Sequence, residues 1–496
     1  MDIFAALGNG FAVALTPMNL LFCLAGVLLG QIVGVVPGIG PAAAISLLLP
    51  LTFGGNAISS TIMFAGIYYG AQYGGTITSV LLSIPGESSS VMTSIDGHQL
   101  ARKGRAGAAL GIAAIGSFIA GILGTLGLAA LAPLLAAGAL AFGPPEYFAL
   151  VVLGLTALAL VGGSVIKGLI MGVLGLCLAT IGTDPQEGST RFIFDQLWLL
   201  DGVEFLVLAV AIFGVGEVLS SAENGQPPAK IEANIKGAWP TRADWQASRW
   251  PILRGSVVGF LVGVLPGAGA TIASFMSYAL EKRLSKHPET FGTGAIEGVA
   301  GPESANNASS AGAMVPMFAL GIPGSNTTAI MLGALVMFGL RPGPQLFEQN
   351  PELVWGIVAS MFVGNALLLV LNMPLAGLSV LLLRARYAVL YPVILAICIA
   401  GVYSQSNSVS DLYLLAGFGV VGYLMQRYAF PAAPLVLGLV LEPLFENALR
   451  QSMTIAQGST AIFITRPISA LLLLASLVSV VWTGVRAHQA RARGRM

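Results

Sequence analysis

Charged side chains are scarce in this chain. Lys, Arg, Asp and Glu together make up 9% of its 496 residues, whereas an average soluble domain carries roughly 25%. Hydrophobic residues make up 56%, so the chain cannot form an ordinary water-facing surface and is expected to lie in a lipid bilayer. The net charge of +1 gives no basis for binding nucleic acid or for electrostatic docking to a membrane surface.

Histidine, cysteine and nucleotide-binding motifs are equally sparse. The three histidines are scattered, and neither a His-Glu-x-x-His pattern nor a Gly-x-Ser-x-Gly elbow is present, which disfavours an intramembrane enzyme. The phosphate-binding pattern Gly-x-x-x-x-Gly-Lys-[Ser/Thr] is also missing. We therefore expect no catalytic residues, no cofactor and no ATP hydrolysis. The cysteines all fall in apolar runs, where they are expected to be small buried hydrophobic residues without disulfides; they are Cys23, Cys177 and Cys398.

Long apolar runs predict an all-α polytopic membrane protein. A helix needs about 20 apolar residues to cross a bilayer, which gives about 10–12 transmembrane helices in this chain. Some of them are interrupted by Gly and Pro and are expected to be broken helices or re-entrant hairpins. The clearest runs are 18–36, 107–128, 146–161, 164–182, 198–219, 353–371, 387–401, 411–426 and 468–484.

Two motifs occur twice and mark an internal duplication. The run from Gly34 to Gly40 returns 229 residues later from Gly263 to Gly269, and Ile84-Pro85-Gly86 returns 238 residues later as Ile322-Pro323-Gly324. Paired Gly/Pro interruptions in two halves are typical of inverted repeats in secondary transporters. The structural residues of these motifs are Gly34, Pro37, Gly38, Gly40, Pro85, Gly86, Gly263, Pro266, Gly267, Gly269, Pro323 and Gly324.

One polar stretch, residues 226–250, separates the two halves. We interpret 1–225 as the first transmembrane repeat, 226–250 as a cytoplasmic linker, and 251–496 as the second repeat with a basic cytoplasmic tail. Basic residues also gather at 102–105 and 282–286, which indicates cytoplasmic faces by the positive-inside rule. The N-terminus and the acidic 183–196 loop are expected outside.

Polar residues gather between the repeated motifs. They lie in 68–79 in the first half and in 302–312 in the second, and we expect each group at the tip of a broken helix or hairpin. A surface loop is the alternative, because Gly, Ser and Asn also form turns. The candidate substrate-binding residues are Thr76, Thr78, Ser88, Ser89, Ser90, Asn306, Asn307, Ser309, Asn326, Thr327 and Thr328.

None of these candidates is basic. An anion would therefore be held by hydroxyl and amide donors and by backbone N–H groups at helix starts, where the helix dipole is positive. Free carbonyls with Ser, Thr and Asn oxygens also suit a cation, so we predict a sodium site near Glu87, Glu303, Ser304 and Ser325. Each Glu could instead be a helix N-terminal acid stabilised by the dipole, or a proton carrier.

The motifs resemble those of one transporter family. The runs at 34–41 and 263–269, together with Tyr-Gly-Ala-Gln-Tyr-Gly-Gly-Thr at 69–76 ahead of Ile84-Pro85-Gly86-Glu87, are similar to the TctA family, the large membrane subunit of tripartite tricarboxylate transporters. The resemblance implies a multi-pass permease of the bacterial inner membrane. Its partners would be a small four-span membrane subunit and a periplasmic solute-binding protein that delivers carboxylates such as citrate. Transport would be symport driven by a sodium or proton gradient.

Two further functions stay open beside the disfavoured enzyme. A channel-like passive conduit for anions or cations could use the same carbonyls and hydroxyls as a filter. A purely structural scaffold subunit is the other alternative, although a scaffold would not need polar breaks at equivalent places in both halves.

Overall fold

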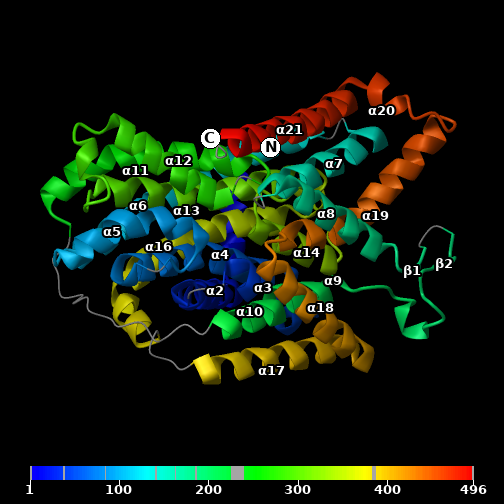
Figure 1. Ribbon diagram of the computed structural model, residues 1–496, viewed down its shortest axis with the longest axis horizontal. Coiled ribbons are helices and arrows are strands. Elements are labelled where there is room, and N and C mark those ends of the chain that lie inside the picture. Colours follow the sequence, from blue (N-terminus) through cyan, green and yellow to red (C-terminus); the bar gives the residue numbers. More distant parts are fainter. Residues whose placement is uncertain are drawn as a thin grey trace. The chain divides into compact units, whose positions relative to one another are not determined.

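The computed structural model is built almost entirely of helices (Figure 1). It describes residues 3–36, 40–83, 85–139, 142–161, 164–184, 187–224, 240–267, 269–382 and 387–493. The predicted all-α polytopic class is confirmed. Among the described residues, six helices are long and apolar enough to cross a membrane: Pro17–Val35, Ala106–Ala139, Phe205–Glu223, Pro351–Asn372, Val409–Arg427 and Ala432–Ile455. The total of about 10–12 crossings stays a prediction.

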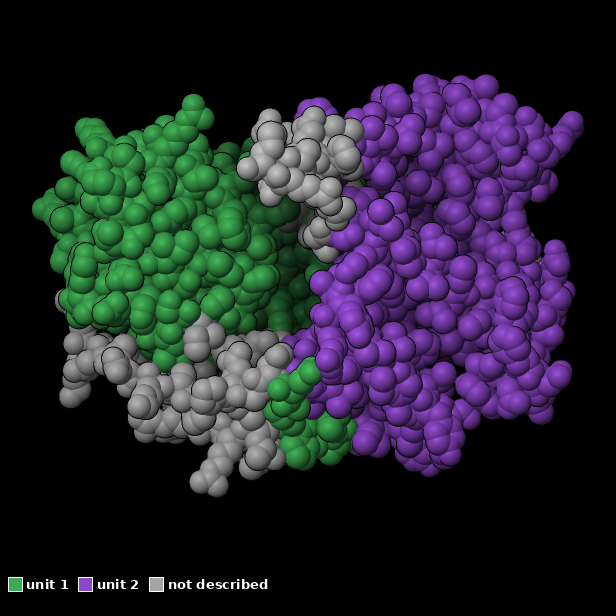
Figure 2. Space-filling model, in the orientation of Figure 1, with its two compact units in different colours: residues 1–136, 221–397 green, residues 137–220, 398–496 purple. Residues whose placement is uncertain are grey.

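The chain folds into two compact units, coloured separately in Figure 2. Unit 1 contains residues 1–136 and 221–397, and unit 2 contains 137–220 and 398–496. Each unit therefore takes segments from both halves of the sequence. The repeats and the linker remain predictions about symmetry, and the compact units follow a different division. The last part of the predicted linker belongs to a helix that begins at Arg242.

Unit 1 holds most of the long helices. Its elements are α1 (Ile3–Ala14), α2 (Pro17–Val35), α3 (Pro41–Thr52), α4 (Ala57–Leu82), η1 (Ser88–Ser90), α5 (Val91–Arg102), most of α6 (Ala106–Ala139), α11 (Arg242–Val264), α12 (Gly269–Leu284), η4 (Pro288–Thr290), α13 (Glu297–Leu320), α14 (Asn326–Met337), α15 (Leu346–Gln349) and α16 (Pro351–Leu382).

Unit 2 combines helices with one short hairpin. Its elements are α7 (Pro144–Val161), α8 (Val165–Ala179), β1 (Gly182–Thr183), β2 (Thr190–Arg191), η2 (Leu197–Leu199), α9 (Phe205–Ala209), η3 (Val210–Val215), α18 (Val409–Arg427), α19 (Ala432–Ile455), α20 (Ile462–Thr465) and α21 (Pro467–Arg493). β1 and β2 pair antiparallel. Helices α10 (Gly216–Asn224) and α17 (Tyr387–Ser406) run across the boundaries of the units.

The first repeated motif ends a helix at equivalent positions in both halves. α2 ends at Val35 and α11 ends at Val264, 229 residues later, and each is capped by a residue in extended conformation. Pro266 thus lies just beyond α11, as expected of a residue that cannot continue a helix. Its counterpart Pro37 and the neighbouring Gly38 lie outside the described residues.

The second motif does the same. α4 ends at Leu82 and α13 at Leu320, 238 residues later. Each helix is followed by a residue in the left-handed conformation, Ser83 with φ 58° and Gly321 with φ 71°, which is a common way to terminate a helix. The chain then passes through Pro-Gly into a new helical segment.

Glycines repeat the packing as well as the turns (Figure 1). α2 packs along α4, and α11 packs along α13, through glycines whose added Cβ would collide with the backbone of the facing helix. In the first pair these glycines are Gly26, Gly30 and Gly34, against Met63, Ile67 and Ala71. In the second pair they are Gly255, Gly259 and Gly263, against Gly301, Ala305 and Ser309. Every residue of the second set is the first set shifted by 229 or 238, so the internal duplication is confirmed by packing.

Two expectations are corrected by the fold. The polar segments 68–79 and 302–312 lie inside the continuous helices α4 and α13 and are neither tips nor surface loops. A helix satisfies its own backbone hydrogen bonds, which outweighs the weak helix preference of Gly, Ser and Asn in a bilayer. Cys23 and Cys398 are buried as expected, but Cys177 is exposed on α8, on a face that lipid can cover.

Candidate functional site

Helices α4 and α13 meet at residues that are equivalent in the two repeats. Gln72 Nε2 donates a hydrogen bond of 2.6 Å to Ser310 Oγ, and the two positions differ by 238 residues, the offset of the second motif. Both side chains are buried. A residue that contacts its own equivalent lies on the axis that relates the two copies. The Gln72–Ser310 contact therefore marks the centre of the duplicated core.

The surrounding helices exchange contacts in the reciprocal way that a two-fold axis requires. α3 of the first half packs against α14 of the second, and α12, the equivalent of α3, packs against η1 and α5. One of these contacts joins Ser88 Oγ and Thr271 Oγ1 at 2.9 Å. Such isologous pairing indicates a pseudo-two-fold relation and excludes a simple translation. The orientation of this axis in the membrane stays a prediction.

Glu303 lies one turn before the axis on α13 and is completely buried, with 0% of its side chain exposed. Its Oε2 accepts hydrogen bonds from Thr76 Oγ1 at 2.6 Å and from Asn306 Nδ2 at 3.3 Å. Its Oε1 accepts a short hydrogen bond from Thr93 Oγ1. None of the ion pairs found among the described residues includes Glu303. The carboxyl group is thus held by neutral donors alone.

A chain of amides extends this polar centre towards α6. Asn307 Nδ2 lies 2.7 Å from Asn306 Oδ1 and 2.8 Å from Ser117 Oγ. Asn307 Oδ1 and the Ser309 hydroxyl have no hydrogen-bond partner among the described residues, although both residues are buried. A buried polar group without a partner costs free energy, so these atoms are candidates for contact with a ligand or water.

The turn of the second half is fixed by a capping box at the start of α14. Ser325 Oγ accepts from the N–H of Thr328, and Thr328 Oγ1 accepts from the N–H of Ser325. Ser325 Oγ also lies 2.9 Å from the hydroxyl of Tyr68 on α4. The N–H groups of Asn326 and Thr327, in the first turn, remain at the positive end of the helix.

The turn of the first half is fixed differently. Glu87 precedes η1 in extended conformation, and its carbonyl accepts from Ser90 Oγ at 2.8 Å. Ser90 Oγ in turn accepts from Ser79 Oγ of α4 at 2.9 Å. The first half thus uses side chains of its own helix α4 to hold its turn.

The structure separates the predicted substrate-binding residues into three groups. Only Ser88 and Asn326 are exposed, and they are equivalent positions. Thr76 and Asn306 meet at Glu303. The others are buried within the helical core, and several bond to their own helix or turn; they are Thr78, Ser89, Ser90, Asn307, Ser309, Thr327 and Thr328.

The residues of the predicted sodium site are distributed over separate contacts. Glu303 contacts Thr76 and Thr93, Ser325 contacts Tyr68 two turns earlier on α4, and Ser304 donates to the carbonyl of Ala300 in its own helix. Sequence reasoning missed Gln72, Ser310, Thr93 and Thr271 as parts of the centre. Aligning the two polar segments at the 238-residue offset would have paired Gln72 with Ser310.

These features define a multi-pass membrane protein with two related helical repeats around a buried polar centre. The chain belongs to the tripartite tricarboxylate transporter TctA family, whose model matches residues 20–437. It is therefore a tricarboxylate transporter component, as its motifs suggested.

Two proteins of Agrobacterium vitis are similar to the chain. The "Uncharacterized 52.8 kDa protein in TAR-I ttuC' 3'region" is 49% identical over 482 residues, which cover 97% of this chain and 96% of that protein. The "Uncharacterized protein in TAR-II ttuC' 3'region" is 48% identical over 223 residues, which cover 45% of this chain and 92% of that protein. No solved structure matches the chain.

Proposed function

We propose that this chain is the permease subunit of a binding-protein-dependent secondary transporter that imports carboxylates of the citrate class across the bacterial inner membrane. Its partners are a small four-span membrane subunit and a periplasmic solute-binding protein. A sodium or proton gradient drives the uptake. The family supports the tripartite assembly, and the geometry of unit 1 supports the substrate class and the coupling.

The observation that carries the proposal is the pair of exposed donors Ser88 and Asn326. They occupy equivalent positions directly after the two Pro-Gly turns, where new helical segments begin. Hydroxyl, amide and backbone N–H groups at helix starts suit carboxylates without a basic residue. Thr271, bonded to Ser88, adds a third donor to this surface.

Glu303 supports coupling to a cation. Importing an anion against a negative-inside potential costs about 2.3 kcal/mol per charge at 100 mV, so a multivalent carboxylate needs accompanying positive charges. A buried carboxyl group with neutral partners only is suited to take up such a charge, since intramembrane acids are rare and usually functional. We therefore narrow the cation site to Glu303 and the donors Thr76, Thr93 and Asn306.

The contacts across the axis favour movement of the two turns as one body. Gln72 bonds to Ser310, and Asp96 Oδ1 of α5 accepts from the N–H groups of Gly292 and Gly294, each at 2.8 Å. An elevator-like movement of this body relative to a fixed scaffold is our proposed access mechanism. A cysteine at Ser88 should then be labelled from both membrane faces in different states, and labelling from one face in every state would reject it.

Uptake of radiolabelled citrate into vesicles tests the function. Uptake should be saturable, should require the binding protein, and should stop when an ionophore collapses the ion gradient. Sodium and proton ionophores applied separately identify the cation. Uptake that persists without the binding protein and does not saturate would instead establish the channel alternative.

A further inference from the structure

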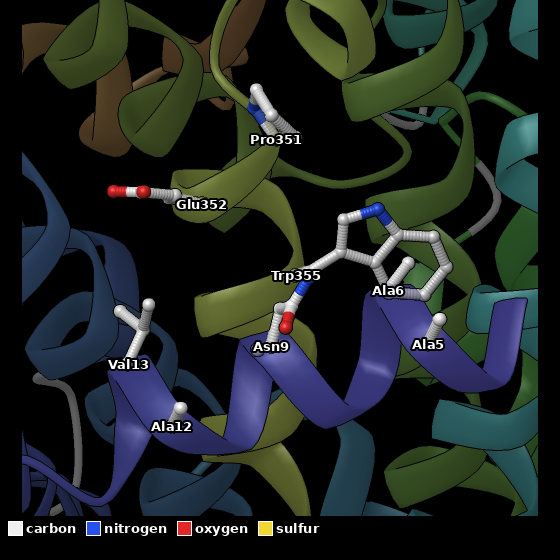
Figure 3. A pocket seen from close by; sticks show the side chains of 9 residues that line it. Ala5, Ala6, Asn9, Ala12, Val13, Pro351, Glu352 and Trp355 are labelled. Carbon is white, nitrogen blue, oxygen red and sulfur yellow. The ribbon is translucent and has the colours of Figure 1, made fainter. Parts of the chain in front are cut away.

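A cleft of about 650 Å³ lies between α1 and α16 in unit 1 (Figure 3). Its lining residues include none of the substrate-site or cation-site candidates. One wall is α1, and the other is the first turn of α16, with Glu352 and Trp355. The cleft therefore needs an explanation separate from the transport site.

Small residues form the α1 wall of this cleft. Ala5, Ala6 and Ala12 line it together with a single amide, Asn9. Within lipid, apolar area alone does not bring helices together, because lipid tails are equally apolar. Small side chains that allow close backbone approach, combined with a polar group that can bond across the contact, are typical of a helix-packing surface.

Trp355 provides an independent indication of an occupant. Its indole ring extends from α16 over Ala5 and Ala6 (Figure 3), and only 2% of the residue is exposed. Its Nε1 has no hydrogen-bond partner among the described residues. A lipid tail offers no acceptor for this N–H, whereas a helix can offer a carbonyl released by a local break or a Ser, Thr or Asn oxygen.

The shape of the surface argues against a second copy of this chain. A symmetric dimer joins the same patch on both partners, so the patch has to be complementary to itself. Two concave clefts placed face to face would leave each other unfilled. A ridge from a different chain fills such a cleft.

We propose that the α1–α16 cleft binds a transmembrane helix of the small membrane subunit. This helix presents small residues at four-residue spacing and an oxygen acceptor towards Trp355. The proposal rests on the tripartite assembly of the proposed function. It adds the surface on which the second membrane subunit binds.

Photocrosslinking in the intact complex tests this surface. A photoreactive phenylalanine derivative is placed at Ala6 or Ala12 and the chain is co-produced with the tagged small subunit and the binding protein. Both positions should form a covalent product with the small subunit. The same residue at Val173 of α8, which is 58% exposed, is the control and should form none. Products containing only a second copy of this chain or only lipid would overturn the proposal.

Substitutions at the cleft provide the second measurement. Ala6→Leu and Ala12→Leu fill the cleft and should lower co-purification of the small subunit about tenfold, with Val173→Leu as a matched control. Trp355→Phe keeps the ring but removes the N–H, and should lower co-purification about threefold. Unchanged co-purification by all three cleft variants would overturn the proposal. Variants that insert poorly are recognised by size-exclusion chromatography, and crosslinking then decides.

The measurement also separates this proposal from the proposed function. Crosslinking is performed without substrate and without an ion gradient. A crosslink to the small subunit in vesicles that do not take up carboxylates would reject the transport proposal alone. Normal uptake by a complex that gives no crosslink would reject the cleft as the binding surface and leave the function intact.

Discussion

The two halves of the core share a backbone but differ in chemistry. α4 and α13 end at equivalent residues, each with a left-handed cap, and each is packed by an equivalent row of glycines. Yet Glu303 of the second half corresponds to Ala65 of the first, and Glu87 of the first corresponds to Ser325 of the second. The duplication therefore accounts for the helix geometry, and the functional candidates are the positions where the halves differ.

Glu303 is the difference that we expect to matter most. Glu303→Gln keeps the shape and leaves Thr76 and Thr93 in place, but it cannot take up a charge. Uptake should fall about hundredfold, the upper range for a lost interaction with a charged group. The initial rate of carboxylate uptake measures this effect, with protein content in the membrane as the control for insertion. Normal uptake would show that the acid is only a structural partner of the three donors.

The exposed pair should produce the next largest effect. Ser88→Ala and Asn326→Ala should each raise the substrate concentration for half-maximal uptake ten- to hundredfold, because a hydrogen bond to a charged ligand contributes about 1.5–3 kcal/mol. Ser46→Ala removes a buried hydroxyl that bonds only within α3 and should leave this value unchanged. If only one of the pair matters, the two turns do not act as equivalent binding groups.

The glycine rows test how similar the halves are. Gly34→Ala and Gly263→Ala both place a Cβ against a facing backbone carbonyl, of Ala71 and Ser309. Each should lower stability by about 1–3 kcal/mol, the usual cost of overpacking, and by similar amounts. Thermal unfolding of the purified protein in detergent measures the loss, with Gly8→Ala, which meets open space, as the control. A large difference between the two variants would break the symmetry of the packing.

One expected similarity between the turns is absent, and it yields a smaller prediction. Gly269 has φ 65°, which disfavours a side chain, but Gly40 has φ −77° and open space around its Cβ position. The expectation that Gly40 requires glycine is therefore wrong, whereas Gly267, with φ 81°, and Gly269 confirm it for the second half. Gly269→Ala should lower stability by about 1–2 kcal/mol. Gly40→Ala should change it little in the same unfolding experiment.

The sequence predicted the repeats and their turns because these features are local. Pro and Gly act on their own backbone and on the preceding turn, so Pro266 ends α11 wherever the helix packs. Contacts between the halves were not predictable in this way. Thr93 and Thr76 come from two different helices to reach Glu303, and nothing in either local segment indicates that meeting.

The polar segments show the opposite error. Gly, Ser and Asn in 68–79 and 302–312 suggested turns, because these residues disfavour helices in water. In a bilayer the backbone has no water to bond with, so a helix forms despite them, and their small side chains then allow α2 and α11 to approach closely. Local preference was a poor guide where the solvent is lipid.

The second half also carries a charged contact that has no equivalent in the first, and its effect should be the smallest. Asp244, at the start of α11 and in the predicted linker, is 7% exposed at its side chain and bonds to Arg105. Burial raises the pKa of this carboxyl, but hydrogen bonds from Arg105 and Thr241 lower it by more, so its net pKa lies below the ordinary value. The ionised form is thus favoured by folding. Its stabilisation is complete above the unfolded-state pKa and is lost as the pH falls through the lower pKa of the folded state.

Asp244→Asn should therefore lower the unfolding temperature at pH 7 and have a smaller effect in acid, where the wild-type carboxyl is also protonated. The equivalent position of the first half is Leu15, which cannot titrate. Leu15→Ala should change the unfolding temperature by the same amount at both pH values, which makes it the control. A pH-independent loss in Asp244→Asn would show that the contact with Arg105 stabilises the α11 start through packing and neutral hydrogen bonds alone.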